Sequence, residues 1–122
     1  MAPVEHTLFS IEGGQAAATR MLRQQVTGII CGSDVLALGA IRAVRRAGLT
    51  VPGDVSVVGY DDSAFMHCTD PPLTTVRQPI DAMGRAVVST LVQQVEGGTV
   101  ATAELLFEPE LVVRGSTARA RG

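Results

Sequence analysis

Two adjacent carboxylates, Asp61 and Asp62, are the residues of this sequence best placed to do chemistry. They directly follow the largely apolar run Val55–Tyr60, which predicts a strand buried on both faces of a parallel sheet. In open α/β sheets the ligand binds at the carboxyl ends of the strands, so Asp61 is the first candidate for a binding residue. The alternative is that both aspartates only shape a turn, since Asp is common where strands meet loops.

No set of residues in the sequence predicts catalysis. Adjacent residues on an extended chain point to opposite sides, so Asp61 and Asp62 are poorly placed to act on one glycosidic bond as an acid and base pair. The stretch Gly32–Asp34 lacks the GxSxG frame of a hydrolase nucleophile, and neither histidine lies near it. All ten basic residues are arginine, and the absence of lysine excludes a P-loop phosphate site and a Schiff-base enzyme. We therefore expect a protein that is not an enzyme and uses no cofactor.

The cysteines and histidines do not predict a metal site either. Cys31 and Cys68 form no metal-binding spacing, and His6 and His67 are equally isolated. Two isolated cysteines in a soluble domain are most often buried thiols, which is the interpretation adopted for both.

The composition predicts one compact domain with an aliphatic core. The chain has 122 residues, of which 46% are apolar but only 3% aromatic. The net charge of −2 leaves no electrostatic footprint for nucleic acid or an anionic membrane. No basic segment followed by an apolar run marks a signal peptide, and no stretch approaches membrane-spanning length. We expect a cytoplasmic protein.

The elements that lead to Asp61 alternate between helix and strand. His6–Ser10 is predicted to be extended, and Glu12–Gly14 to be a turn that opens a helix over Gln15–Gln25, with its apolar side toward a sheet. Thr27–Cys31 is the next buried strand. This alternation favours a three-layer α/β fold, a parallel sheet with helices on both faces.

The second helix is the best defined, running from Ser33 to the last-turn arginines. Ser33 is expected to cap its N-terminus, where the charge of Asp34 suits the helix dipole. Gly48 follows as the stop signal. Its charged side is interpreted as a solvated face, made of Arg42, Arg45 and Arg46.

The second half of the chain predicts fewer regular elements. Leu73–Val76 is extended, and Pro79 opens a third helix that reaches about Glu96. Two short extended pieces follow at Glu104–Phe107 and Glu110–Val113. The tail Gly115–Gly122, rich in Arg, Ala, Ser and Thr, is expected to be disordered.

Three blocks stand in this order along the chain: TGIICGSDVLALGAIRAVRRAGLTVPGDVSVVGYDD, PPLTTVRQPIDAMGRAVVSTLV and ELVVRGST. Together they resemble the signature blocks of the lactose/galactose repressor family of bacterial transcription regulators, over roughly Phe9–Thr117. The resemblance implies the C-terminal lobe of a periplasmic-binding-protein-like effector domain. By it, residues 1–78 form that lobe, 79–97 a helix belonging to the other lobe, 98–114 the return strands and 115–122 the disordered tail.

The resemblance also implies four effector-binding residues. Phe9 matches a position where an aromatic ring stacks on the ligand, and Asp61 matches an acceptor for hydroxyl or amine groups. Gln78 matches an amide at the junction of the lobes, and Ser33 stands where many members have asparagine. Alternatives remain: Phe9 could belong to the core, and Ser33 could serve only as a helix cap.

By this resemblance the chain is the part of a regulator that binds an effector, a sugar or nucleobase-like molecule, in a cleft between lobes and shifts affinity for operator DNA. DNA would be contacted only through a headpiece that has no counterpart here. Two other functions stay open: a sugar-binding module of transport or chemosensing, and a segment kept only for association. A homodimer is expected because the third helix carries an apolar stripe of Ile80, Met83, Val87, Leu91 and Val95. The identity of the effector is left open.

Overall fold

The computed structural model describes residues 1–100 and 104–122 and divides into two compact units. The first unit combines Met1–Arg77 with Leu111–Gly122, and the second is Gln78–Glu110. The chain therefore leaves the first unit after Arg77 and re-enters it at Leu111.

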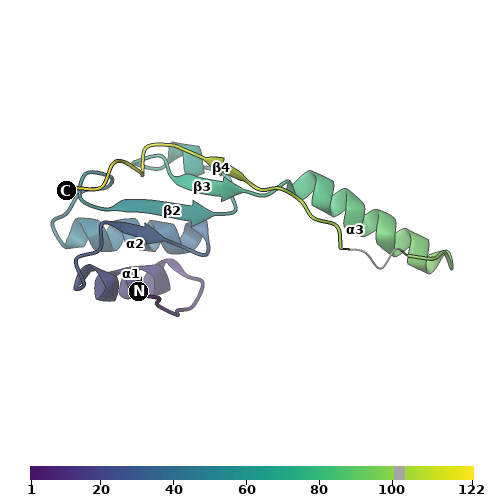
Figure 1. Cartoon of the computed structure of the whole chain (residues 1–122), viewed down its shortest axis with the longest axis horizontal. Coiled ribbons are helices and arrows are strands. Elements are labelled where there is room, and N and C mark those ends of the chain that lie inside the picture. Colours follow the sequence, from purple (N-terminus) through teal and green to yellow (C-terminus); the bar gives the residue numbers. More distant parts are fainter. Residues whose placement is uncertain (101–103) are drawn as a thin grey trace. The chain divides into compact units, whose positions relative to one another are not determined.

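A four-stranded sheet in the order β1-β2-β3-β4 organises the described residues (Figure 1). The strands are β1 (Gly28–Ile30), β2 (Ser56–Tyr60), β3 (Thr74–Arg77) and β4 (Glu110–Val112). β1, β2 and β3 run parallel, with Ile29 opposite Val57 and Gly59 opposite Thr75. The predicted α/β class is confirmed, but β4 makes the sheet mixed rather than wholly parallel.

The first helix, α1 (Ile11–Leu22), begins four residues earlier than predicted. The Ser10 hydroxyl accepts a hydrogen bond from the Gly13 amide at 2.9 Å, which caps the helix. Gly13 and Gly14 therefore lie inside the first turns of α1 and do not form the expected turn before it. The second helix, α2 (Asp34–Arg46), begins after Ser33 as predicted.

α2 packs on β2, and α1 packs on the far side of α2 (Figure 1). Two glycines permit this close approach: a Cβ on Gly14 would collide with the backbone of Leu36, and one on Gly39 with the carbonyl of Ile11. α1 thus faces α2 rather than the sheet. Both helices of the first unit lie on one side of the sheet, so the expected cover on both faces is not present among the described residues of that unit. Ile30, on the other face, is 85% exposed.

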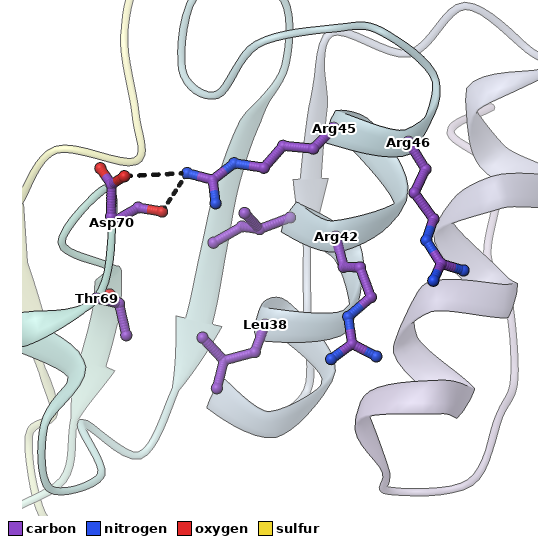
Figure 2. Close-up of a pocket in the computed structure, with 7 residues that line it drawn as sticks. Leu38, Arg42, Arg45, Arg46, Thr69 and Asp70 are labelled. Carbon is purple, nitrogen blue, oxygen red and sulfur yellow. Dashed lines mark hydrogen bonds and ion pairs between the residues drawn. The ribbon is translucent and has the colours of Figure 1, made fainter.

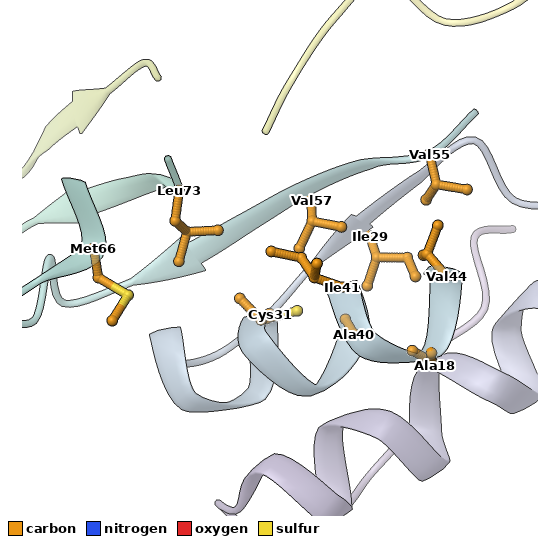
Figure 3. Close-up of a cluster of buried hydrophobic side chains, with 12 residues drawn as sticks. Ala18, Ile29, Cys31, Ala40, Ile41, Val44, Val55, Val57, Met66 and Leu73 are labelled. Carbon is orange, nitrogen blue, oxygen red and sulfur yellow. The ribbon is translucent and has the colours of Figure 1, made fainter. Parts of the chain in front are cut away.

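The core lies between α2 and the covered face of the sheet and is aliphatic, as the composition predicted (Figure 3). Val44, Val57 and Leu73 are completely buried. β2 alternates between buried and half-buried residues, which differs from the predicted strand buried on both faces. The reason is the same as for Ile30: α2 covers only one side.

The tail expected to be disordered is instead bound to the sheet. Ser116 is fully buried, its hydroxyl donates to the Val57 carbonyl at 2.6 Å, and it accepts from the Thr74 amide at 2.8 Å. Further along, the Ala118 amide donates to the Ser56 hydroxyl at 3.0 Å. Hydrogen bonds to strands distant in sequence order this segment despite its polar composition.

The second unit consists of α3 (Ile80–Val95) and the segment after it. None of the 16 residues of α3, all of them described, is buried. Gly97, with φ of 75°, ends the helix as predicted. Glu104–Phe107, predicted to be extended, is assigned no strand, and residues 101–103 of the predicted return segment 98–114 lie outside the described residues. No helix in the described part of the chain is long and apolar enough to cross a membrane.

Candidate functional site

The carboxyl ends of β1 and β2 meet at one edge of the first unit, because the two strands are parallel. Gly32 and Ser33 follow β1, and Asp61 follows β2. Phe9 lies against this edge: its Cζ atom is 3.9 Å from the position that a Cβ on Gly32 would take. Phe9 is 73% exposed, so the alternative that it belongs to the core is wrong. The edge therefore presents an exposed aromatic ring beside polar groups.

Ser33 is the N-cap of α2, as predicted. Its hydroxyl accepts a hydrogen bond from the Leu36 amide at 3.2 Å, and the residue is only 5% exposed. The capping bond uses one lone pair of the hydroxyl, which leaves its proton available for a second hydrogen bond. A role in binding a ligand stays a prediction.

Asp61 stands in a strained stretch of backbone. Its φ is 111° and that of Asp62 is 53°, values that favour glycine and cost about 1–3 kcal/mol for a side chain that must adopt them. The Asp61 amide donates to the Val76 carbonyl at 2.9 Å, which extends the pairing of β2 with β3 past the end of β2. Strain of this kind is held by its surroundings and recurs at ligand-binding positions.

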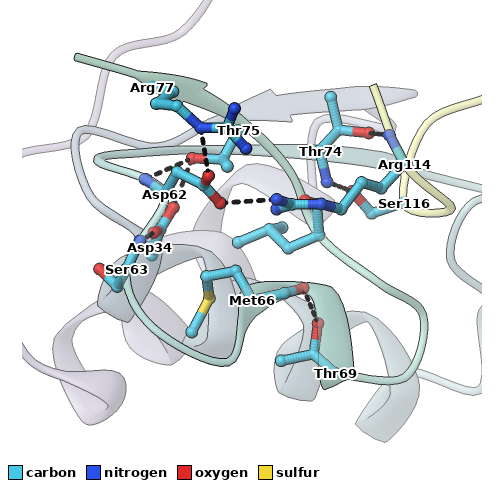
Figure 4. Close-up of polar contacts among 11 residues, drawn as sticks. Asp34, Asp62, Ser63, Met66, Thr69, Thr74, Thr75, Arg77, Arg114 and Ser116 are labelled. Carbon is cyan, nitrogen blue, oxygen red and sulfur yellow. Dashed lines mark hydrogen bonds and ion pairs between the residues drawn. The ribbon is translucent and has the colours of Figure 1, made fainter. Parts of the chain in front are cut away.

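Asp34 binds the loop after β2 through its buried carboxylate, a role that was not predicted from the sequence. The residue is 1% exposed, and both oxygens of its carboxylate accept hydrogen bonds (Figure 4). Oδ1 accepts from the Thr75 hydroxyl at 2.6 Å and Oδ2 from the Ser63 amide at 2.6 Å. Gly59 makes room for it, since a Cβ there would collide with Oδ1. Asp34 thus joins α2, β3 and the loop after β2. The only signal in the sequence was an acidic residue at a helix N-terminus, which does not reveal partners 29 and 41 positions away.

Asp62, in the loop after β2, is ion-paired to two arginines (Figure 4). Its Oδ2 lies 2.7 Å from Nε of Arg77, and its Oδ1 lies 2.8 Å from a terminal nitrogen of Arg114. Burial raises the pKa of Asp62, but hydrogen bonds and positive charge from the two guanidinium groups outweigh it and hold the pKa below its ordinary value of 3.8. The carboxylate stays ionised at neutral pH and is committed to these partners.

Gln78, the fourth predicted binding residue, follows β3 directly and is the first residue of the second unit. Of the predicted set, the first unit contributes Phe9, Ser33 and Asp61. That Gln78 joins them in one site stays a prediction.

The cysteines differ from each other. Cys31 is buried, and burial raises the pKa of its thiol to about 12, so it is inert and neutral. Cys68 is exposed, which corrects the expectation of two buried thiols. It is the last residue of the short 3₁₀ helix Met66–Cys68. Among the described residues no group of three or more His, Cys, Asp or Glu could hold a metal ion.

A hollow of about 530 Å³ lies beside α2 (Figure 2). It is lined by Leu38, Ile41, Arg42, Arg45, Arg46, Thr69 and Asp70. Arg45 donates to the backbone carbonyl of Asp70, and its guanidinium lies 3.5 Å from the Asp70 carboxylate. The predicted solvated face is therefore exposed, but it surrounds a concave surface.

The chain matches the periplasmic binding protein-like domain over residues 2–117. It is 56% identical over 119 residues to the HTH-type transcriptional regulator MalR of Streptomyces coelicolor, which covers 98% of this chain and 35% of that protein. Among solved structures it is similar to the transcriptional regulator CelR–cellobiose complex, with a TM-score of 0.86, 38% identity and coverage of 93% and 35%. A dimeric Lac repressor with an 11-residue C-terminal deletion gives a TM-score of 0.82, 37% identity and coverage of 92% and 42%. The chain spans about a third of the length of the curated relatives it matches.

Proposed function

This chain belongs to the periplasmic binding protein-like domain family, and we propose that it is the effector-binding part of a bacterial transcription regulator. The predicted resemblance to the lactose/galactose repressor family is confirmed by the relatives it matches. The proposal makes it a binding protein of the cytoplasm with no enzymatic activity. The observation that carries the proposal is the polar edge at the ends of β1 and β2 with an exposed Phe9 beside it.

A sugar is the ligand class that the chemistry of this edge favours. The flat face of Phe9 suits the C–H surface of a pyranose ring, and the Asp61 carboxylate can accept hydrogen bonds from its hydroxyl groups. Ser33 supplies a hydroxyl proton, and Gln78 an amide that both donates and accepts. The similar regulator CelR was solved in complex with cellobiose, which supports the same class of ligand.

Operator DNA would be bound by parts of a regulator that lie outside the region matched here. The net charge of −2 does not favour binding of this chain to a phosphate backbone. A ligand at the strand edge would act by favouring one arrangement of the effector domain over another.

Dimerisation belongs to the same proposal. In α3, Ile80 is 61% exposed, Val87 67%, Leu91 57% and Val95 78%, and half-buried Met83 completes the stripe. Exposed apolar residues in such a row favour a partner surface, and the similar Lac repressor structure is of a dimer.

The test is a thermal-shift screen of the chain against mono- and disaccharides and nucleobases at millimolar concentration. A ligand at 100 times its dissociation constant adds about 2.7 kcal/mol of stability. We expect a sugar to raise the melting temperature, and the shift to disappear in Phe9→Ala and Asp61→Asn. Asp70→Asn changes an exposed carboxylate at the hollow beside α2; it is the matched control and should keep the shift. A sugar shift that survives both site variants would contradict the assigned edge, and no shift with any sugar would contradict binding by this part of the protein.

A further inference from the structure

The ion pairs of Asp62 connect three places that are far apart in the sequence. Arg77 is the last residue of β3 and the last before the chain enters the second unit. Arg114 comes three residues after Leu111, where the chain returns to the first unit. A single carboxylate therefore contacts the segments on both sides of the excursion (Figure 4).

Arg114 is itself firmly placed. Its side chain is 14% exposed, and a second guanidinium nitrogen donates to the Leu73 carbonyl at 2.9 Å. Its backbone amide donates to the Thr74 hydroxyl at 2.9 Å. Arg114 thus ties the returning segment to β3, and its contact with Asp62 extends this tie to the loop after β2.

The loop that carries Asp62 needs such a restraint. Asp61 and Asp62 both have positive φ, a backbone state that persists only when neighbouring contacts enforce it. One restraint on the loop is the hydrogen bond that the Ser63 amide donates to the Asp34 carboxylate. The other restraint is the pair of ion pairs that Arg77 and Arg114 make with the side chain of Asp62.

We infer that Asp62 is a positioning residue: it holds Asp61 in its strained conformation and links that residue to both segments that lead to the second unit. The inference rests on the proposed function in one respect, namely that Asp61 is where the ligand binds. A ligand that shifts Asp61 then also shifts Asp62, and through Asp62 the segments that carry Arg77 and Arg114.

The test is native-state amide hydrogen exchange of the 122-residue chain, and it needs no ligand. In Asp62→Asn, a neutral residue that tolerates positive φ, we expect the Asp61 and Arg114 amides to exchange about three- to tenfold faster. The Cys31 amide, which donates to the Val58 carbonyl between β1 and β2, should be unchanged. Asp62→Glu keeps the charge and should restore most of the protection, which loss of a merely space-filling side chain would not explain.

Asp54→Asn is the matched control, because Asp54 is also ion-paired to an arginine, Arg121, and its side chain is similarly covered. It should speed exchange in the tail and leave Asp61 and Arg114 unchanged. Unchanged exchange at Asp61 and Arg114 in Asp62→Asn would overturn the inference, as would equal acceleration across the whole sheet. Because the exchange measurement uses no sugar, its result is independent of the thermal-shift screen. Failure of the role inferred for Asp62 can therefore be distinguished from failure of the proposed function.

Discussion

At the scale of single residues, Asp34 joins three elements: α2, β3 and the loop after β2. Its carboxylate is buried, accepts two short hydrogen bonds and sits at the first position of α2, where a negative charge is favourable. A hydrogen bond to a charged group contributes about 1.5–3 kcal/mol, and a buried donor left without a partner costs a similar amount.

We therefore expect Asp34→Ala to lower the free energy of unfolding by about 3 kcal/mol in urea titrations. Asp34→Asn, which keeps one acceptor oxygen, should lose about half as much. Glu12→Ala removes an exposed acid from the first turn of α1 and should cost less than about 1 kcal/mol. Equal losses in Asp34→Ala and Glu12→Ala would show that only the helix dipole matters.

A second prediction for a single residue concerns Asp54, which is ion-paired to Arg121 in the tail. The pKa of Asp54 is lowered because the backbone amide and hydroxyl of Thr50 donate to its carboxylate, with a further contribution from Arg121. A lowered pKa means that the stabilisation is fully present above the ordinary value of 3.8 and is lost as the pH falls through the lower, folded value.

Carboxyl carbon chemical shifts followed by NMR should accordingly place the titration of Asp54 below 3.8, accompanied by changes at the Ala118 and Arg121 amides. In Arg121→Gln the pKa should rise part of the way back, since the Thr50 bonds remain. Titration of Asp54 at or above 3.8 in the unmodified chain would refute the assignment.

At the scale of elements, the helix whose ends are set by neighbouring residues was predicted correctly from the sequence. α2 was predicted from Ser33 to Gly48 because both of its end signals are adjacent to it in the chain. The start of α1 was misplaced because Gly13 and Gly14 suggested a turn. In the structure Gly13 lies against the backbone of Leu8, and Gly14 lets α1 approach α2 at Leu36. The tail was misjudged because its order comes from bonds to Val57 and Thr74, and these partners cannot be read from a polar segment.

The same limits apply to the candidate site. The location of Asp61 after β2 could be predicted from the strand pattern, and Phe9 was named from a family resemblance; that either binds a ligand stays a prediction. The ion pairs of Asp62 could not be predicted. One partner, Arg77, lies 15 positions away on β3, and the other, Arg114, follows the whole second unit. Contacts made across such separations depend on the sheet order, which the pattern alone does not give.

The contact between α1 and α2 leads to the prediction at this scale. Gly39→Ala adds a methyl group that would meet the Ile11 carbonyl, so the helices must separate, and overpacking of this kind costs about 1–3 kcal/mol. Gly84→Ala is the control, because nothing lies within 4 Å of its added methyl group in α3. It should be neutral or stabilise α3 by up to about 1 kcal/mol, since alanine favours helix more than glycine. Thermal unfolding of both variants, followed by circular dichroism, separates the two effects; a Gly39→Ala variant as stable as the unmodified chain would refute the close packing.

At the scale of the whole molecule, the apolar stripe of α3 predicts association. Leu91→Asp places a charge in that stripe and should shift sedimentation-equilibrium data from a dimer toward the mass of a monomer. Ser89→Asp introduces the same charge at an exposed position outside the stripe and should leave the mass unchanged. A monomeric mass for the unmodified chain at micromolar concentrations would exclude α3 as a dimer interface.

The division of the first unit into Met1–Arg77 and Leu111–Gly122 also bears on the order of events during synthesis. When a ribosome has translated residue 77, that unit still lacks Arg114 and Ser116, which supply partners for Asp62, Val57 and Thr74. The nascent chain must therefore keep the edge of β3 unpaired until all of α3 has been made. Exposed strand edges are where chains pair wrongly, so during this interval the chain is open to misassembly and to binding by chaperones.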